Sequence, residues 1–282
     1  MTALGRPALH PFAKGHGAGN DFIVLPDPHD RLTLTTSDVI RLCDRHTGIG
    51  ADGILRAVRT TAPGAAATAG GEWFMDYRNA DGTLGQMCGN GIRVLARYLV
   101  ETGRCPPGVL TIATRAGLRT THVPHTGSDA PITVAMGRPC LPGPAETSIV
   151  VGARTWPAVP VDMGNPHAVA FVDDLTCPGT LTAPPIVSPA NAFLQGVTVE
   201  FVMRLGPRHL AVRVHERGVG ETRACGTGAC AAVAADIAAT GTSPGTYTVD
   251  MPGGRLRIAV LADTSMELTG PADIVATGTV RL

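Results

Sequence analysis

Two short motifs occur twice in this sequence, in the same order, and this repetition constrains the fold more than any other feature. The first half contains "GNDFIV" (19–24) and then "CGNG" (88–91), and the second half contains "GNPHAV" (164–169) and then "CGTG" (225–228). Each motif is short, but their ordered recurrence about half a chain apart predicts a duplicated unit. We therefore expect two similar domains related by a pseudo-twofold axis, with Cys88 facing Cys225 across an interdomain cleft that holds the active site.

The chain length agrees with this division, since 282 residues are enough for two modest domains. We expect an N-terminal domain over residues 1–130 and a C-terminal domain over 131–271, with a last strand at 272–282 that returns to the first domain. Two long segments, 197–218 and 246–263, read as hairpins that turn at Gly206-Pro207 and at Pro252-Gly253-Gly254. Hairpins with few long helices indicate an α+β fold with antiparallel sheets.

Helices are expected after each repeated cysteine. After Cys88, apolar residues follow at helical spacing as far as Leu99, while Arg93 and Arg97 point away from that face, and Gly103 is a natural stop. After Cys225 the sequence "GTGACAAVAADIAATG" is apolar nearly all round, which predicts a buried helix that ends at Gly241. A third, short helix is expected over "TTSDVIRLCDRH", capped near Thr36 or Ser37.

Charge and composition exclude several functional classes. The 23 basic and 23 acidic residues balance, so neither nucleic acid nor a membrane surface is an expected partner. No apolar run approaches 18 residues, and the first residues lack a signal-peptide pattern, so we expect a cytoplasmic protein. The seven cysteines are an odd number without zinc spacing, which favours thiols over disulfides or a metal site.

Lysine content bears on the chemistry. Lys14 is the single lysine among the 23 basic residues. A pyridoxal-phosphate mechanism needs a Schiff-base lysine, which here would have to be Lys14 near the N-terminus. The sequence therefore disfavours pyridoxal chemistry, and no cofactor is expected.

A cysteine at a helix start has a specific chemistry. The N-terminus of a helix carries unpaired N–H groups and about half a positive charge, which favours a thiolate and binds a carboxylate. If Cys88 and Cys225 flank one carbon, a thiolate can remove its proton while a thiol delivers another from the opposite side. Two negative charges at close range disfavour each other, so the pair should share one proton over some pH range. The outcome is inversion of a stereocentre without a cofactor.

Further segments resemble the diaminopimelate epimerase family. They span nearly the whole chain and stand in the family's order: "KGHGAGNDFIVL", "HTGIGADGILR", "MDYRNADGTLGQMCGNGIRVLARYL", "VDMGNPHAVAFV", "VHERGVGETRACGTGACA" and "PGGRL". The resemblance implies an isomerase that interconverts LL- and meso-diaminopimelate without pyridoxal phosphate, in the synthesis of lysine and peptidoglycan precursors. It also implies two similar α+β domains, each a curled antiparallel sheet around a central helix, and a homodimer.

The resemblance also assigns roles to residues. Cys88 and Cys225 are the two acid/base thiols. The remaining assignments are substrate contacts: Gly89, Asn90, Gly226 and Thr227 around the reacting α-carboxylate, Asn20 near that end, Asn79, Asn165 and Arg217 at the distal amino-acid end, and Glu216 and His167 lining the site. A guanidinium such as that of Arg217 suits a distal carboxylate because it binds both oxygens.

One departure from the family leaves alternatives open. In a segment like "NVEF" the family usually carries an asparagine that contacts the distal end of the substrate. In this chain Thr198 stands in its place. A hydroxyl is shorter than an amide and offers one donor, and losing such a contact costs about 1 kcal/mol. A second interpretation is therefore a related racemase or epimerase of another amino acid in secondary metabolism. A third, from a different class, is a thiol redox or ligand-binding protein without turnover.

Overall fold

The structure, a computed structural model, describes residues 9–63, 65, 70–125, 130–142, 146–194 and 196–282. The chain forms two compact units. Unit 1 comprises the described residues of Met1–Gly17, Asp21–Ile132 and Ala272–Leu282, and unit 2 comprises Ala18–Asn20 and the described residues of Thr133–Pro271.

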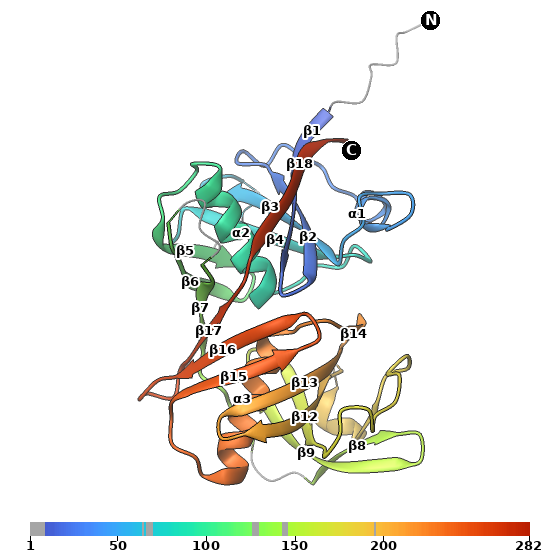
Figure 1. Ribbon diagram of the computed structural model, residues 1–282. Coiled ribbons are helices and arrows are strands. Elements are labelled where there is room, and N and C mark those ends of the chain that lie inside the picture. The colour runs from blue at the N-terminus through green and yellow to red at the C-terminus, as the bar shows by residue number, and fades with distance from the viewer. Residues whose placement is uncertain (1–8, 64, 66–69, 126–129, 143–145, 195) are drawn as a thin grey trace, which may run out of the picture. The chain divides into compact units, whose positions relative to one another are not determined.

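Unit 1 is a sheet wrapped around one helix (Figure 1). Its strands are β1 (Leu9–Gly17), β2 (Asn20–Pro26), β3 (Gly53–Arg59), β4 (Trp73–Asn79), β5 (Gly108–Thr114), β6 (Gly117–Val123) and β18 (Asp273–Arg281). They pair in the order β18-β1-β2-β3-β4-β5-β6. Helix α2 (Gly89–Glu101) contacts β18 and β1 at one end of this order and β5 and β6 at the other, so the sheet curls around it.

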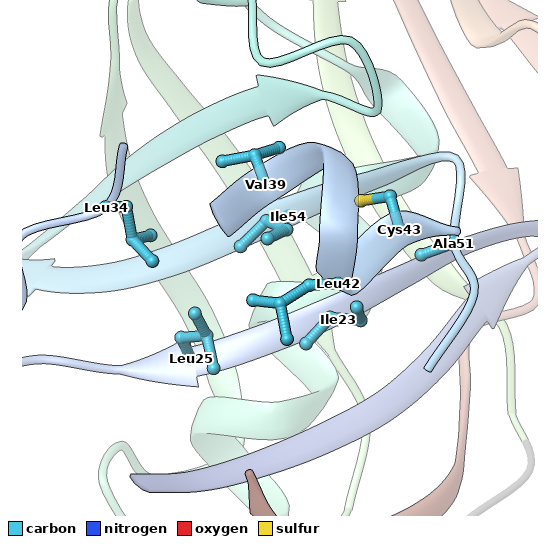
Figure 2. Packing of buried hydrophobic residues seen from close by; sticks show 8 residues of the cluster. All are labelled: Ile23, Leu25, Leu34, Val39, Leu42, Cys43, Ala51 and Ile54. Carbon is cyan, nitrogen blue, oxygen red and sulfur yellow. The ribbon is translucent and has the colours of Figure 1, made fainter. Parts of the chain in front are cut away.

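A short helix, α1 (Thr36–Cys43), contacts strand β3 of unit 1. It begins one residue earlier than expected, because Thr35 is its N-cap and forms a capping box with Asp38. Its buried face packs Val39, Leu42 and Cys43 against Ile23 and Ile54 of β2 and β3 (Figure 2).

Unit 2 has the same plan, with additional strand pairs that include β8–β11, β13–β14, β16–β17 and β7–β17. Its elements are β7 (Ile132–Gly137), β8 (Thr147–Val151), β9 (Arg154–Asp162), β10 (Pro166–Phe171), β11 (Ile186–Ser188), a 3-10 turn (Ala190–Phe193), β12 (Thr198–Gly206), β13 (His209–Glu216), β14 (Gly220–Thr222), α3 (Gly226–Thr240), β15 (Thr246–Met251), β16 (Gly254–Val260) and β17 (Met266–Gly270). Helix α3 contacts β9, β10, β12, β13, β16 and β17. Both hairpins turn where the sequence predicts, between β12 and β13 and between β15 and β16.

The strand pairing of the two units matches step by step. In unit 1, β2 is parallel to β3, β3 antiparallel to β4, β4 parallel to β5, and β5 antiparallel to β6. In unit 2 the same sequence of directions runs through β10, β12, β13, β15 and β16. Each central helix follows the third strand of this series, since α2 lies between β4 and β5, and α3 between β13 and β15. The repeat inferred from two short motifs is thus present in the topology.

The α+β fold with a curled sheet around each central helix is confirmed, but the sheets are mixed and not antiparallel throughout. The parallel pairs are β2–β3 and β4–β5 in unit 1 and β10–β12 and β13–β15 in unit 2. Parallel neighbours need a long crossover connection, and here α2 and α3 each lie in such a crossover. A hairpin reading detects only strands that are adjacent in sequence, which is why the parallel pairs were not expected.

Both central helices are buried over most of their length. Helix α3 is buried from Gly226 to Asp236 and ends at Gly241, whose φ of 67° is left-handed, as expected. Helix α2 is buried from Gly89 to Val100, so the expectation that Arg93 and Arg97 lie on a separate polar face is wrong. Both guanidinium groups instead donate hydrogen bonds inside unit 1, and those of Arg97 go to the carbonyls of Ala130 and Ala272.

Candidate active site

The repeated cysteines cap the two central helices in nearly identical geometry. Cys88 is the N-cap of α2 with φ −140° and ψ 119°, and Cys225 is the N-cap of α3 with φ −129° and ψ 118°. In each case the sulfur accepts from the backbone N–H three residues later, at 3.4 Å, from Gly91 and Gly228 respectively. A cap sulfur that accepts a backbone N–H sits at the positive end of the helix, where thiolate and carboxylate groups are stabilised.

Glycines in the first turn let other groups approach these caps. A Cβ atom on Gly91 would lie 3.1 Å from Leu55 Cδ2 and 3.4 Å from the Cβ of Cys88. A Cβ atom on Gly228 would lie 2.6 Å from Glu200 Oε1, a distance that real Cβ contacts do not reach. The repeated glycine is therefore a packing requirement at Gly228, whereas at Gly91 a methyl group would be tight but would meet the movable end of Leu55.

The turn at Cys88 contains a buried amide and a buried guanidinium. Asn90 is 1% exposed and Arg93 is 0% exposed. Arg93 Nη1 donates to the carbonyl of Gly89 at 2.9 Å, and Nη2 donates to Asn90 Oδ1 at 2.8 Å. Arg93 was not expected at the site. The sequence could have indicated its role. An arginine in the second turn of a helix that packs inside a sheet must find hydrogen-bond acceptors nearby.

The turn at Cys225 carries hydroxyl and carboxylate groups. The Cys225 sulfur lies 3.4 Å from Thr227 Oγ1. Glu200 on β12 and His167 on β10 are fully buried, and His167 Nδ1 lies 2.7 Å from Glu200 Oε1. Burial, followed by the charges of Glu216 and Glu200, raises the pKa of the Cys225 thiol well above its usual value. Glu200 was missed at the sequence level, although an acidic residue inside the apolar strand "TVEFV" was its signal.

Glu216 and Arg217 follow each other at the end of β13. Glu216 Oε1 accepts from the hydroxyl of Thr222 at 2.5 Å. The backbone N–H of Arg217 donates to Thr198 Oγ1 at 3.3 Å, and Thr198 is also the strand partner of His167. A Cβ atom on Gly196 would lie 2.9 Å from Arg217 Cδ, so Gly196 leaves room for the arginine stem. Unit 2 thus brings together His167, Thr198 and Arg217 from three separate parts of the sequence.

Three of the four candidate asparagines lie at strand ends. Asn20 opens β2 after Gly19 (φ 77°), and Asn165 precedes β10 after Gly164 (φ 92°), so the repeated Gly-Asn motif has the same left-handed turn in both places. Asn20 is buried and Asn165 is half-buried. Asn79 ends β4, where its Nδ2 donates to Thr83 Oγ1 at 2.9 Å. Asn79 belongs to unit 1, as do Cys88, Gly89 and Asn90, whereas the other candidate site residues belong to unit 2.

The single lysine lies in unit 1. The ammonium group of Lys14 pairs with the carboxylate of Asp21 at 2.5 Å. The same carboxylate accepts two hydrogen bonds from the Arg45 guanidinium, at 3.0 and 2.7 Å. Within the described ranges, no group of three or more His, Cys, Asp and Glu side chains could hold a metal ion. Of the helices in that same part of the chain, none has the length and apolar character needed to cross a membrane.

Comparison with known sequences gives one consistent family. The sequence profile described as diaminopimelate epimerase matches residues 12–141 and 159–275. The chain is 54% identical to the diaminopimelate epimerase of Streptomyces coelicolor, over 95% of this chain and 94% of that protein. It is 44% identical to the diaminopimelate epimerase of Mycobacterium ulcerans, over 95% of this chain and 96% of that protein.

Solved structures share the fold at low sequence identity. A predicted epimerase from Pseudomonas aeruginosa has a TM-score of 0.70 at 15% identity, covering 96% of this chain and 99% of that chain. A hydroxyproline epimerase from Agrobacterium vitis has a TM-score of 0.69 at 15% identity, covering 97% and 93% respectively. These likenesses support the two-domain α+β fold.

Proposed function

Because the chain belongs to the diaminopimelate epimerase family, we propose that it is an isomerase that interconverts LL- and meso-diaminopimelate, a step toward lysine and peptidoglycan precursors. The observation that carries the proposal is the matched pair of cysteine N-caps. Both cap sulfurs accept the same backbone hydrogen bond, and both precede a glycine-rich first turn.

In the proposed mechanism Cys88 and Cys225 act from opposite faces of one α-carbon. One sulfur, as thiolate, takes the α-proton, and the electron pair left on carbon is delocalised into the adjacent carboxylate. The other sulfur, as thiol, then gives its proton to the opposite face and becomes the thiolate. The configuration at that carbon is inverted, and the number of protons held by the pair is unchanged, so the same pair serves the reverse reaction.

The substrate contacts follow from the chemistry of each group. The N-terminal turns of α2 and α3 suit the reacting α-carboxylate through Gly89, Asn90, Gly226 and Thr227. The Arg217 guanidinium suits the distal carboxylate, with Asn79, Asn165 and Thr198 as polar neighbours of the distal amino-acid end. Asn20, His167 and Glu216 complete the proposed lining. No cofactor takes part in this scheme, and we place the protein in the cytoplasm as a homodimer, as the family resemblance implies.

A direct assay tests the proposal. The purified protein, kept reduced, is incubated with LL-diaminopimelate in D₂O without added cofactor. We expect meso product and deuterium at the inverted α-carbon, observed by ¹H NMR and chiral chromatography. Absence of both in a folded, reduced protein would count against the assignment.

Thr198 favours a second candidate, a racemase or epimerase of another amino acid. Its hydroxyl accepts from the Arg217 backbone and therefore has one donor left for a ligand, whereas an asparagine would have an amide. The same deuterium assay with a panel of other amino acids separates the two candidates. Exchange into another amino acid but not into diaminopimelate would establish the second one.

A further inference from the structure

The segment that leads to Cys88 is bound by the two-residue turn between β5 and β6. This turn consists of Arg115 and Ala116. The backbone N–H of Ala116 donates to the carbonyl of Gln86 at 3.3 Å. The guanidinium of Arg115 donates from Nη1 to the carbonyl of Gly85 at 3.2 Å. Gly85 and Gln86 form the lead-in segment of the cysteine, and the turn contacts both of them.

Unit 2 contains the same backbone contact at the equivalent place. The turn between β15 and β16 consists of Pro252 and Gly253. The N–H of Gly253 donates to the carbonyl of Arg223 at 2.8 Å. Arg223 stands two positions before Cys225, which is the spacing found in unit 1. In both units, the hairpin that follows the central helix therefore binds the residue two positions before the cysteine cap.

The two turns use an arginine in opposite ways. In unit 1 the arginine belongs to the turn, and its place is taken in unit 2 by Pro252. In unit 2 the arginine belongs to the segment before the cysteine, where Arg223 Nη2 donates to the carbonyl of Pro252 at 3.4 Å. Each cysteine cap is thus preceded by one backbone hydrogen bond and one guanidinium contact to the same hairpin.

We propose that Arg115 is a positioning residue, which fixes the lead-in segment and thereby places the Cys88 sulfur at the cap of α2. This inference rests on the proposed function, in which that sulfur exchanges a proton with the substrate carbon. An N-cap residue lies at the edge of the helical hydrogen bonds, so its position depends on the chain before it. A displacement of about 1 Å between reacting groups can cost about a hundredfold in rate.

Arg115 can hold the lead-in segment because its guanidinium is anchored on a buried carboxylate. Nη2 donates to Oδ1 of Asp76, which is 1% exposed. The other oxygen of this carboxylate accepts from Arg56 Nε at 2.9 Å. From this anchored position Nη1 donates to two carbonyls, those of Tyr77 and Gly85, at 3.0 and 3.2 Å. One planar group thus joins β4 to the lead-in segment, and the single ammonium of a lysine cannot reproduce these directions.

The lead-in segment also lies directly on β4. The N–H of Gly85 donates to the carbonyl of Tyr77 at 3.0 Å, and a Cβ atom on Gly85 would collide with the Tyr77 ring. That ring makes an edge contact with Phe22, with 6.0 Å between the ring centroids. The Arg115 guanidinium therefore closes a contact in which the backbone of the lead-in segment already fits the strand.

Arg78 offers a matched control. Its side chain is 19% exposed, as is that of Arg115, and it pairs with the same Asp76 carboxylate. Its Nη1, however, donates to the carbonyl of Leu34, outside the lead-in segment. Arg115→Lys and Arg78→Lys each keep a positive charge and remove the fork. We expect Arg115→Lys to lower kcat for LL-diaminopimelate at least about tenfold with KM within about threefold, and Arg78→Lys to change kcat less than about twofold.

Labelling of Cys88 without substrate separates this inference from the proposed function. A sulfur displaced from the cap loses the N–H of Gly91 and the positive helix end, which both favour the thiolate. In peptide-resolved iodoacetamide labelling of the full chain, half-maximal labelling of Cys88 should therefore move to higher pH in Arg115→Lys and stay in place in Arg78→Lys. The exposed Cys140 is the internal reference.

An unmoved Cys88 profile in Arg115→Lys, or an equal movement in Arg78→Lys, would overturn the positioning role, whether or not the protein epimerises diaminopimelate. Hydrogen exchange locates the change. We expect the Gly85 amide to exchange at least about tenfold faster in Arg115→Lys than in the wild type or in Arg78→Lys, and equal rates would likewise refute the role. Arg115→Met and Arg78→Met repeat all three comparisons if a lysine variant does not fold.

Discussion

His167 Nδ1 and Glu200 Oε1 lie 2.7 Å apart on neighbouring parallel strands, and neither side chain is exposed. The same carboxylate oxygen lies against Gly228, whose N–H binds the Cys225 sulfur. Burial raises the pKa of Glu200, and the hydrogen-bonded His167 partly opposes this shift. The His167–Glu200 pair is therefore a buried polar group that packs against the first turn of α3.

Glu200→Gln should make the Cys225 thiol more acidic. A carboxylate charge near a thiol disfavours the thiolate, and Glu200 is one of the groups that raise the pKa of Cys225, after burial and Glu216. Glutamine keeps the side-chain volume and removes the charge, so the pKa of Cys225 should fall. Peptide-resolved iodoacetamide labelling across pH is expected to show half-maximal labelling of Cys225 at a lower pH than in the wild type. Glu267→Gln on β17 is the control, and a Cys225 profile that does not move in Glu200→Gln would contradict the role.

The cysteines themselves give the most direct prediction for turnover. Cys88→Ser and Cys225→Ser each remove one of the two proposed proton carriers, because a serine hydroxyl is a far weaker acid than a thiol. We expect turnover of LL-diaminopimelate to fall by at least about a hundredfold in each variant, in line with the contribution of a positioned acid or base. Cys140→Ser, which replaces an exposed cysteine, is the control and should retain full activity. A Cys88 or Cys225 variant with undiminished turnover would remove that residue from the mechanism.

The sequence predicted those features that depend on local pattern. The repeated motifs located both cysteine caps, and the turn residues located both hairpins and the end of α3. Parallel pairs such as β2–β3 escaped prediction because their partners are brought together by a crossover and not by a turn. Periodicity also misplaced Arg93, since it counts an arginine as solvent-facing and cannot detect that Gly89 and Asn90 provide buried acceptors. Glu200 escaped for the same reason, because its buried partner His167 lies 33 residues earlier in the chain.

The two first-turn glycines should differ in their tolerance of alanine. In Gly228→Ala the new methyl group would lie 2.6 Å from Glu200 Oε1, which is held by His167 and cannot move aside easily. We expect a loss of about 1–3 kcal/mol in the free energy of unfolding, as for overpacked cores. In Gly91→Ala the nearest atom is the end of the Leu55 side chain, at 3.1 Å, which can shift. Urea unfolding of both variants compares them, and equal stability of the two would show that the Glu200 carboxylate does not constrain α3.

Thr198, a proposed substrate contact, accepts a hydrogen bond from the backbone of Arg217, and Thr198→Val tests that link. Valine keeps the shape of threonine but removes the oxygen that accepts from the Arg217 N–H at 3.3 Å. The loss of one such hydrogen bond is worth about 1 kcal/mol, so we expect KM for LL-diaminopimelate to rise roughly fivefold. Because Arg217 is proposed to bind the distal carboxylate and not the reacting carbon, kcat should change less than KM. Thr133→Val, which breaks a hydroxyl contact to Thr269 elsewhere in unit 2, is the matched control. If Thr198→Val lowered kcat and left KM unchanged, Thr198 would act on the chemical step and not on the distal end of the substrate.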